Sequence, residues 1–258
     1  MTLQDKADRL LSLHEDPALL TVVNVWDPIS AKAVAAEPGT KALATASHSI
    51  AASFGYEDGE RIPLDLHLEA IDRIVQATDL PVSADLEAGY GDVGETIRRA
   101  IGVGVVGANI EDQLKPLDEA VRGVEAALAA GEAEGIRFVL NAGTDALVRG
   151  ADRTPEQNLE DAVTRGQAYL AAGAPVVFVP GRLDEAQVRT LVEAFGERKL
   201  SLINVPGSLP LAKLAELGVA RVSFGPWSQR VALTALQDLV RDVHAGGGAI
   251  PDGTRVLN

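Results

Sequence analysis

The sequence contains no cysteine, a single methionine and few aromatic residues, which make up 4% of its 258 residues. Without cysteine, the chain can form no disulfide, no thiolate metal site and no cysteine nucleophile. No apolar run approaches the roughly 18 residues that a membrane-spanning helix needs. The polar start of the chain, residues 1–6, has no apolar stretch of the kind found in secretory signals. We therefore expect a cytoplasmic protein.

Positive charge is also scarce: the sequence has 23 Lys and Arg residues and 37 Asp and Glu residues, which give a net charge of −14. A field of that sign repels nucleic acid and anionic membrane surfaces, so neither is an expected partner. An anionic substrate would need a local countercharge, most simply a metal ion. The 47% share of hydrophobic residues is typical of a globular protein with a sizeable core.

Short β-branched segments alternate with longer helical segments along the chain. Strands are expected at residues 21–25, 41–46, 81–85, 105–110, 137–141, 175–179, 200–205 and 219–224. Helices are expected at residues 28–36, 66–77, 93–101, 117–133, 155–172, 184–195, 209–216 and 227–244. Strands that are apolar on both faces and alternate with helices predict a parallel sheet. Eight such repeats favour a closed (β/α)8 TIM barrel over an open doubly wound sheet, whose glycine-rich nucleotide-binding turn is missing.

No internal linker, low-complexity tract or charge block divides the chain. We therefore expect a single barrel domain over residues 1–243. Residues 244–258 are rich in glycine and are expected to form a flexible or loosely docked tail.

Carboxylates follow two neighbouring predicted strands, at the end where barrel enzymes place their active sites. Asp85 ends one strand and Glu87 follows on the same face. Oxygen ligands of this kind, with waters, suit Mg²⁺ or Mn²⁺. The alternative is a helix cap followed by a solvated loop acid. Glu111 and Asp112 end the next strand and could support the same ion.

Five motifs occur in order between Asn24 and Leu239. They are Asn-Val-Trp-Asp-Pro-Ile-Ser-Ala at 24–31, Gly-Tyr-Glu-Asp-Gly at 55–59, Asp-Leu-Glu-Ala-Gly-Tyr-Gly at 85–91, Glu-Asp-Gln at 111–113 and Arg-Val-Ser-Phe-Gly at 221–225. Together they resemble the isocitrate lyase/phosphoenolpyruvate mutase superfamily. The resemblance implies a Mg²⁺-dependent barrel, often with its last helix swapped between subunits. Such enzymes make or break C–C or C–P bonds next to a 2-oxo acid or its enolate.

The resemblance also implies roles for particular residues. Asp85 corresponds to the metal ligand, acting directly or through water, and Glu87 takes the place of a second family aspartate. Glu111 corresponds to the carboxylate that holds metal-bound waters. Asp58 matches a mobile-loop aspartate that closes over the substrate and orients or protonates the reacting group. Ser47 lies where family members cradle the substrate carboxylate.

Four further residues at strand ends are candidates for contacting the substrate. His48 is either a proton shuttle or a hydrogen-bonded histidine of the rim. Trp26 either walls the ligand pocket or packs at the barrel mouth. Asn204 either reaches the ligand or bonds within its own loop, and Asn141 ends another strand at the same rim.

Two departures from the family pattern limit the expected activity. Family lyases have Lys-Arg-Cys-Gly-His where this chain has Gln-Leu-Lys-Pro-Leu at 113–117, so cleavage of isocitrate or methylisocitrate through that cysteine is not expected. The asparagine of the phosphonopyruvate-forming mutases is also missing there. Gly143 stands where the family usually has a substrate-binding arginine. Arg182 or Lys115 could supply another cation, the substrate could be smaller or less charged, or catalysis could be impaired.

We therefore expect a Mg²⁺-dependent enzyme that cleaves a C–C bond β to the carboxylate of a small 2-oxo or 2-hydroxy acid, as a decarboxylase or lyase with an enolate intermediate. A phosphonate enzyme, resembling phosphoenolpyruvate mutase or phosphonopyruvate hydrolase, is one alternative. A catalytically weakened barrel that binds a 2-oxo acid is another. Apolar residues at helical spacing in 227–244, together with the resemblance, predict a homodimer or homotetramer.

Overall fold

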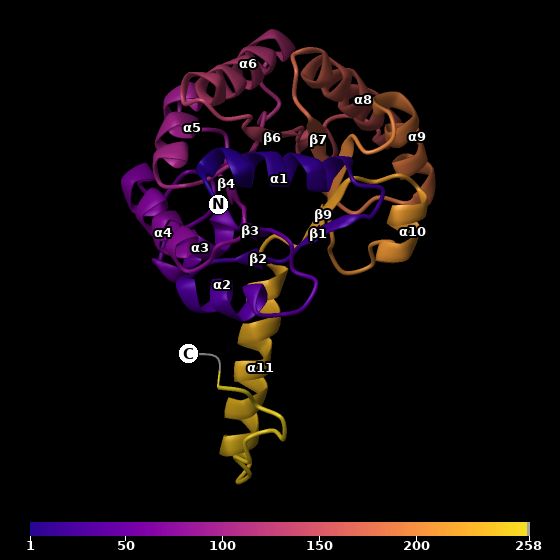
Figure 1. The fold of residues 1–258 in the computed structure, drawn as a ribbon. Coiled ribbons are helices and arrows are strands. Elements are labelled where there is room, and N and C mark those ends of the chain that lie inside the picture. The colour runs from indigo at the N-terminus through magenta and orange to yellow at the C-terminus, as the bar shows by residue number, and fades with distance from the viewer. Residues whose placement is uncertain (257–258) are drawn as a thin grey trace.

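The computed structural model describes residues 1–256, which form a closed parallel barrel surrounded by helices (Figure 1). Its sheet has nine strands in the order β1-β9-β8-β7-β6-β5-β4-β3-β2. The predicted TIM barrel is confirmed, but the first predicted strand is broken at Val23. Its first half, β1 (Leu20–Val22), pairs with β9 (Arg221–Ser223), and its second half, β2 (Asn24–Val25), pairs with β3 (Leu43–Thr45). Both halves together close the ring.

The side chain of Asn24 reinforces this closure. Its Oδ1 accepts hydrogen bonds from the main-chain N of Phe224 at 2.7 Å and of Gly225 at 2.8 Å. Its Nδ2 donates to the carbonyl oxygen of Thr45 at 2.7 Å. One buried amide thus links the broken first strand to both of its neighbours, and satisfied buried amides of this kind stabilise a single register.

The remaining elements follow the predicted alternation with small shifts at their ends. The other strands are β4 (Val82–Asp85), β5 (Gly107–Ile110), β6 (Val139–Gly143), β7 (Val176–Val179) and β8 (Leu200–Ile203). The outer helices are α2 (Pro28–Ala35), α4 (Leu64–Gln76), α5 (Val93–Gly102), α6 (Leu117–Ala133), α8 (Pro155–Ala171), α9 (Glu185–Phe195) and α10 (Leu211–Glu216). Capping boxes at Asp27, Thr154 and Asp184 satisfy first-turn N–H groups and start three of these helices.

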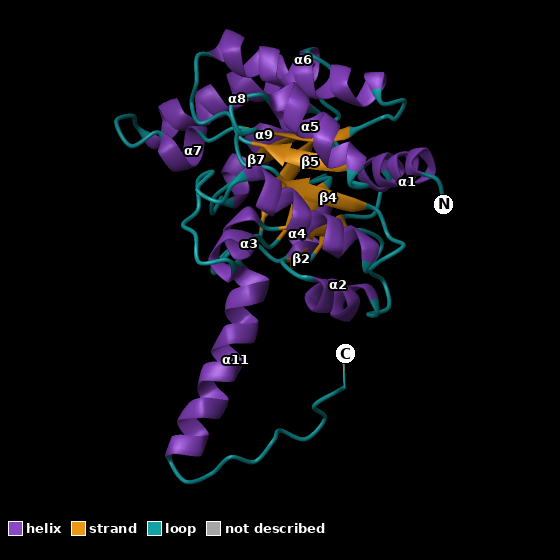
Figure 2. Ribbon diagram, turned by 90° about the vertical axis from the view of Figure 1, so that its left-hand side faces the viewer, coloured by secondary structure: helices purple, strands orange, loops and turns teal. Residues whose placement is uncertain are grey.

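Three helices were not predicted: α1 (Leu3–Glu15), α3 (Ser47–Ser53) and α7 (Ala146–Arg149). α1 is largely polar and buries a narrow stripe that includes Leu10 and His14. It covers the end of the barrel where the strands begin, so close to β5 that a Cβ on Gly107 would lie 2.8 Å from Leu10 Cδ2. α3 and α7 lie at the opposite end of the barrel (Figure 2).

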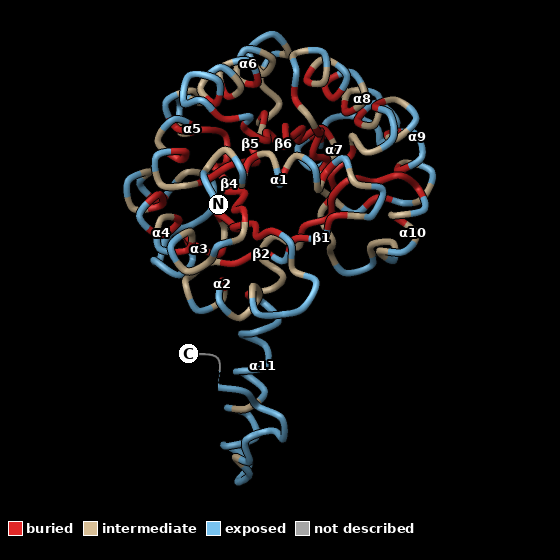
Figure 3. Tube along the Cα trace, in the orientation of Figure 1, coloured by how far each residue is buried: buried red, intermediate tan, exposed pale blue. Residues whose placement is uncertain are grey.

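The last helix, α11 (Trp227–His244), projects away from the barrel (Figures 1 and 2). Its base is fixed by Gln229, whose Nε2 donates to the carbonyl oxygen of Ser49 and to Ser53 Oγ, both at 3.1 Å. Beyond its first turn the helix is exposed, whereas the strands are buried (Figure 3). Val231 is 70% exposed and Leu236 55%. The helix thus presents an apolar face to solvent.

The predicted tail, residues 244–258, begins where α11 ends, and its last two residues lie outside the described part of the chain. The described tail returns toward the barrel, where Arg255 Nη1 lies 2.6 Å from Glu37 Oε1. Within residues 1–256, none of the helices has the length and apolar character needed to cross a membrane.

Candidate active site

A cluster of carboxylates lies at the C-terminal ends of β4 and β5, the end of the barrel opposite α1. Asp85 Oδ2 accepts two hydrogen bonds from Ser47, one from its main-chain N at 3.0 Å and one from Oγ at 2.8 Å. The main-chain N of Asp85 donates to Thr45 Oγ1 at 2.9 Å. Burial raises the pKa of Asp85, and the nearby negative charge of Asp58 raises it further.

Glu87 is buried beside Asp85 and has a φ of 55°, in the left-handed region that residues other than glycine rarely adopt. Its Oε2 accepts a hydrogen bond from the main-chain N of Gly59 at 3.0 Å, while Oε1 is buried without a hydrogen-bond partner. Burial, followed by the charge of Asp58, raises the pKa of Glu87 to about 7. Backbone strain and an unpartnered buried oxygen are features that proteins concentrate at functional sites.

Glu111 joins the cluster through its backbone, since its N donates to the carbonyl oxygen of Glu87 at 2.7 Å. Burial and the charge of Asp85 raise the pKa of Glu111 to about 8. Arg149 opposes this shift, with Nη2 at 3.8 Å from Glu111 Oε2. Asp85, Glu87 and Glu111 therefore disfavour one another's charged forms.

This carboxylate cluster fits a hard divalent cation. Mg²⁺ is commonly held by one or two carboxylates and several waters. Among the described residues, no three Asp, Glu, His or Cys side chains form a ready-made ligand set, so waters would have to complete the coordination of an ion here. A cation would also compensate the charges that raise the three pKa values.

The loop between α3 and α4, residues 54–63, covers the cluster. Besides the bond from Gly59 to Glu87, Glu60 Oε1 accepts a hydrogen bond from the main-chain N of Tyr90 at 2.6 Å. Asp58, one residue before Gly59, is exposed, and its charge acts on both Asp85 and Glu87. The structure therefore places Asp58 near the cluster, and its closure over a substrate stays a prediction.

Other predicted substrate contacts have different surroundings. Ser47 begins α3 and directs its hydroxyl to Asp85 rather than into open space. His48 is half-buried, and its Nδ1 lacks a hydrogen-bond partner. Asn141 is fully buried in β6, and its Nδ2 donates to Asn109 Oδ1 at 2.6 Å. Ser47 thus positions a carboxylate, and Asn141 takes part in a pair of buried amides.

The structure does not bring Trp26 or Asn204 to the carboxylate cluster. Trp26 lines a groove of about 530 Å³ with Ile29, Trp227 and Val231, between α2 and α11. Asn204 follows β8, which is separated from β4 by three strands of the sheet. Its main-chain N donates to the carbonyl oxygen of Ser223 at 2.7 Å. Packing at the barrel mouth, one of the two predicted roles of Trp26, agrees with its position.

Asp112, predicted as a further support for the ion, instead accepts hydrogen bonds from protein groups with both of its carboxylate oxygens. Its Oδ2 accepts hydrogen bonds from Tyr169 OH at 2.6 Å and from Arg165 Nη1 at 3.1 Å. Its Oδ1 accepts from the main-chain N of Leu114 and of Asp145, both at 3.0 Å. This buried aspartate shapes the loops after β5 and β6 and is not free to bind a metal.

Sequence reasoning missed Arg149, the last residue of α7. Its Nε donates to Asp145 Oδ2 at 3.1 Å, beside its contact with Glu111. The position of Arg149 shortly after β6, at the end of the barrel that carries the cluster, could have identified it. No helix was predicted there. Lys115, one of the predicted replacement cations, pairs with Glu119 at 3.7 Å on α6.

A (β/α)8 barrel with a carboxylate cluster at the C-terminal ends of its strands is typical of barrel enzymes. Comparison with known proteins shows the family. Residues 10–244 match the phosphoenolpyruvate phosphomutase family. A Burkholderia cenocepacia protein designated a phosphonomutase has a crystal structure with a TM-score of 0.86 and 41% identity, over 92% of this chain and 99% of that one.

Two curated relatives have named activities. The oxaloacetate decarboxylase of Paraburkholderia xenovorans is 30% identical over 92% of this chain and 82% of its own length. The phosphonopyruvate hydrolase of a Variovorax species is 25% identical over 94% of this chain and 88% of its own. The chain belongs to the phosphoenolpyruvate mutase family, within the isocitrate lyase/phosphoenolpyruvate mutase superfamily. It is an enzyme of this superfamily of lyases and mutases, as its motifs implied.

Proposed function

We propose that this protein is a Mg²⁺-dependent enzyme that cleaves the C–C bond β to the carboxylate of a small 2-oxo or 2-hydroxy acid. The carboxylate cluster carries the proposal. Its pKa shifts mark a site where negative charge is concentrated and underneutralised, which suits a metal-bound anionic substrate. The relative named oxaloacetate decarboxylase supports C–C cleavage.

Asp85 and Glu87 would hold the ion, which when bound would supply positive charge to an enolate formed on bond cleavage. Ser47 keeps Asp85 oriented through its two hydrogen bonds. Glu111 would orient waters around the ion. Asp58, on the covering loop, would orient or protonate the reacting group and exclude bulk water when the loop is closed.

The short connection between β5 and α6 argues against the phosphonopyruvate-forming reaction of the family mutases. Only residues 111–116 separate the two elements, and Asp112 fixes this connection through its four hydrogen bonds. The family resemblance associates the phosphonopyruvate-forming reaction with a longer loop here. A phosphonate enzyme is the second candidate, because a relative is named phosphonopyruvate hydrolase.

The decisive experiment measures turnover of 2-oxo acids, 2-hydroxy acids and phosphonopyruvate, with Mg²⁺ and with chelator. Metal-dependent C–C cleavage with no release of phosphate from phosphonopyruvate is the expected result. Phosphate release alone would establish the phosphonate alternative. Tight binding without any turnover would identify the weakened, ligand-binding barrel. Asp85→Ala should abolish both Mg²⁺ binding and turnover.

We also propose that α11 joins subunits in a homodimer or homotetramer. The exposed apolar side chains of Leu236, Val240 and Val243, which share one face of the helix, support this arrangement, because isolated helices rarely present such a face to water. The groove lined by Trp26, Ile29 and Trp227 lies at the base of the same helix.

A further inference from the structure

Arg149 provides positive charge at the rim of the carboxylate cluster. Its Nη2 lies 3.8 Å from Glu111 Oε2, and its Nε donates to Asp145 Oδ2 at 3.1 Å. Half of its side chain is exposed. A guanidinium has five N–H donors, so after these two contacts it retains donors that can bind a planar anion.

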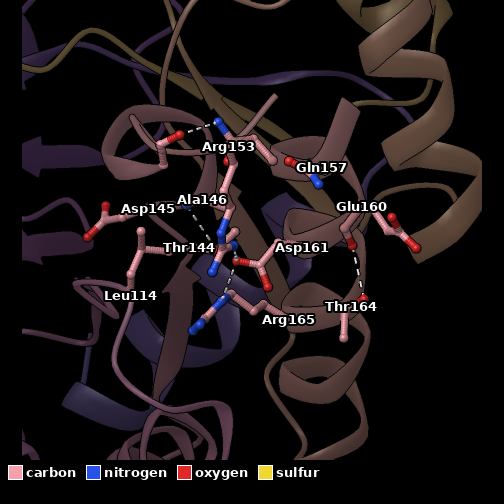
Figure 4. A network of polar contacts seen from close by, with 12 residues as sticks. Leu114, Thr144, Asp145, Ala146, Arg153, Gln157, Glu160, Asp161, Thr164 and Arg165 are labelled. Carbon is pink, nitrogen blue, oxygen red and sulfur yellow. Dashed lines mark hydrogen bonds and ion pairs between the residues drawn. The ribbon is translucent and has the colours of Figure 1, made fainter. Parts of the chain in front are cut away.

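Hydrogen bonds anchor the segment that carries Arg149 at both of its ends. At its start, Asp145 accepts a hydrogen bond from the main-chain N of Gln113 at 2.9 Å and donates its own N to Asp112. At its end, Asn158 Nδ2 donates to the carbonyl oxygen of Gly150 at 2.9 Å. Further along, Asp161 accepts from both Arg153 and Arg165 and ties the segment to α8 (Figure 4). These bonds anchor the backbone on both sides of Arg149, while its guanidinium is held by the hydrogen bond to Asp145.

Other cations near the barrel mouth have their direct contacts outside the three cluster carboxylates. Lys115 pairs with Glu119. The Arg182 guanidinium lies against the loop after β8, where a Cβ on Gly207 would be 3.2 Å from its Nη1. Arg221 is fully buried inside the barrel, with Nη1 3.1 Å from Ser83 Oγ. Among the described residues, Arg149 is the one whose positively charged group lies within 4 Å of a carboxylate of the cluster, that of Glu111.

Gly143 cannot simply be replaced by an arginine in this backbone. A Cβ at that position would lie 2.8 Å from the carbonyl oxygen of Ile110. The end of β6 is therefore packed too closely against β5 to present a side chain there. A cation on this side of the site has to come from a neighbouring element, and α7 places Arg149 there.

Strand order fixes the direction in which a ligand would extend. Asp85, Glu111 and Arg149 follow β4, β5 and β6, which are consecutive in the sheet. Neighbouring strands are about 4.8 Å apart, so the span from β4 to β6 is roughly 10 Å. That span suits a four- or five-carbon acid with a charge at each end better than a three-carbon monoacid.

We propose that Arg149 binds the anionic group of the substrate that is remote from the metal-binding 2-oxo or 2-hydroxy carboxylate. The residue thereby selects doubly charged substrates over singly charged ones. This inference rests on the proposed function, because it assumes that the first carboxylate lies at the Asp85 side of the site.

The test compares malate with 2-hydroxybutyrate, two four-carbon acids that differ in a terminal carboxylate or methyl group. Their binding to the Mg²⁺-loaded protein is measured by calorimetry for the wild type, Arg149→Met and Arg149→Lys. Arg149→Met should weaken malate binding roughly ten- to a hundredfold, the scale of a lost charge-assisted hydrogen bond. Binding of 2-hydroxybutyrate should change less than twofold, and Arg149→Lys should restore part of the preference.

Arg98→Met is the matched control, because Arg98 is an exposed arginine that pairs with Glu95 on α5. It should leave both affinities unchanged.

If Arg149→Met weakens the binding of malate and of 2-hydroxybutyrate equally, Arg149 only maintains Glu111, and the proposal is overturned. Loss of the preference in Arg182→Met instead of Arg149→Met would also overturn it. If the wild type binds neither acid and turns over no oxo acid, the proposed function itself fails. If it turns over oxo acids while Arg149→Met keeps its malate preference, only the Arg149 assignment fails.

Discussion

Asp85 and Ser47 are joined by two hydrogen bonds to a single carboxylate oxygen, Oδ2, from the main-chain N and from Oγ of the serine. The bonds connect the end of β4 to the first residue of α3. They fix the position of Oδ2 and so orient the whole carboxylate at the rim of the barrel.

Replacing Ser47 by alanine removes one of these two bonds. We expect Ser47→Ala to weaken Mg²⁺ binding about 10- to 100-fold, because partners that orient a metal ligand have effects of that size. Calorimetric titration with Mg²⁺ measures the effect. Ser49→Ala is the control, since the Ser49 hydroxyl is buried in the same helix without a partner. Equal Mg²⁺ affinity in Ser47→Ala and wild type would show that the bond does not serve the site.

Asp58 is expected to act on the substrate rather than on the metal. Asp58→Ala should lower turnover by roughly two orders of magnitude or more, the scale of a lost acid–base group, and should leave Mg²⁺ affinity nearly unchanged. Steady-state kinetics and metal titration together separate the two roles. Glu57→Ala, at the neighbouring exposed position, should retain activity. Full activity of Asp58→Ala would contradict this role and would show that residues 54–63 only connect α3 to α4.

The raised pKa values predict how the stability of the metal-free protein depends on pH. Glu87 titrates near 7 and Glu111 near 8 in the folded state, against an ordinary value of 4.5. Between about pH 4.5 and 8 the folded state thus binds more protons than the unfolded state, and the free energy of unfolding falls as pH rises. The loss from Glu87 is on the order of 3 kcal/mol.

Glu87→Gln should remove that contribution, so with chelator present the variant should be more stable than the wild type at pH 8.5 and similar to it near pH 4. Urea unfolding followed by circular dichroism at both pH values measures this. Glu69→Gln, an exposed substitution on α4, should follow the wild-type profile. Stability of the metal-free wild type that rises across this pH window would contradict the prediction.

Gly143 is expected to be essential to the packing of β6 on β5. Gly143→Ala should destabilise the protein by about 1–3 kcal/mol, because its Cβ would lie 2.8 Å from the Ile110 carbonyl oxygen. Gly123→Ala on α6, whose Cβ would meet Val93 Cγ2 at 3.7 Å, should instead be neutral or stabilising. Denaturant midpoints compare the two variants. Equal stability of Gly143→Ala and wild type would show that the strands can separate at no cost.

The apolar face of α11 is expected to be buried between subunits. Leu236→Asp should lower the oligomeric mass measured by light scattering at micromolar concentration, because it would bury an unpaired charge at the contact. Gln237→Asp introduces the same charge at the adjacent position, on a different face of the helix, and should preserve the assembly. A monomeric wild type would exclude a subunit role for the helix.

Local patterns in the sequence determined the alternation of strands and helices, and with it the barrel. Apolar periodicity acts within a few positions, so the ranges of α6 and α11 could be predicted to the residue. Asp184 likewise marks the start of α9 through its capping box. That Asp85, Glu87 and Glu111 lie at one rim could also be predicted, because parallel strands of a barrel all end there. The broken first strand could not, since it depends on the distant contacts of Asn24 with Phe224 and Gly225.

Only the tertiary structure decided which polar residues at that rim are available. Asp112 and Glu111 are adjacent in the sequence, but their surroundings differ. The carboxylate of Asp112 accepts hydrogen bonds from Arg165 and Tyr169, more than 50 positions away, whereas Glu111 lies in the cluster. Arg149, on α7 after β6, lies 3.8 Å from Glu111, which follows β5, although the two residues are far apart in the sequence. Composition and spacing set the kinds of side chain at the rim, but hydrogen bonds and ion pairs between distant segments determine which carboxylates have protein partners and which do not.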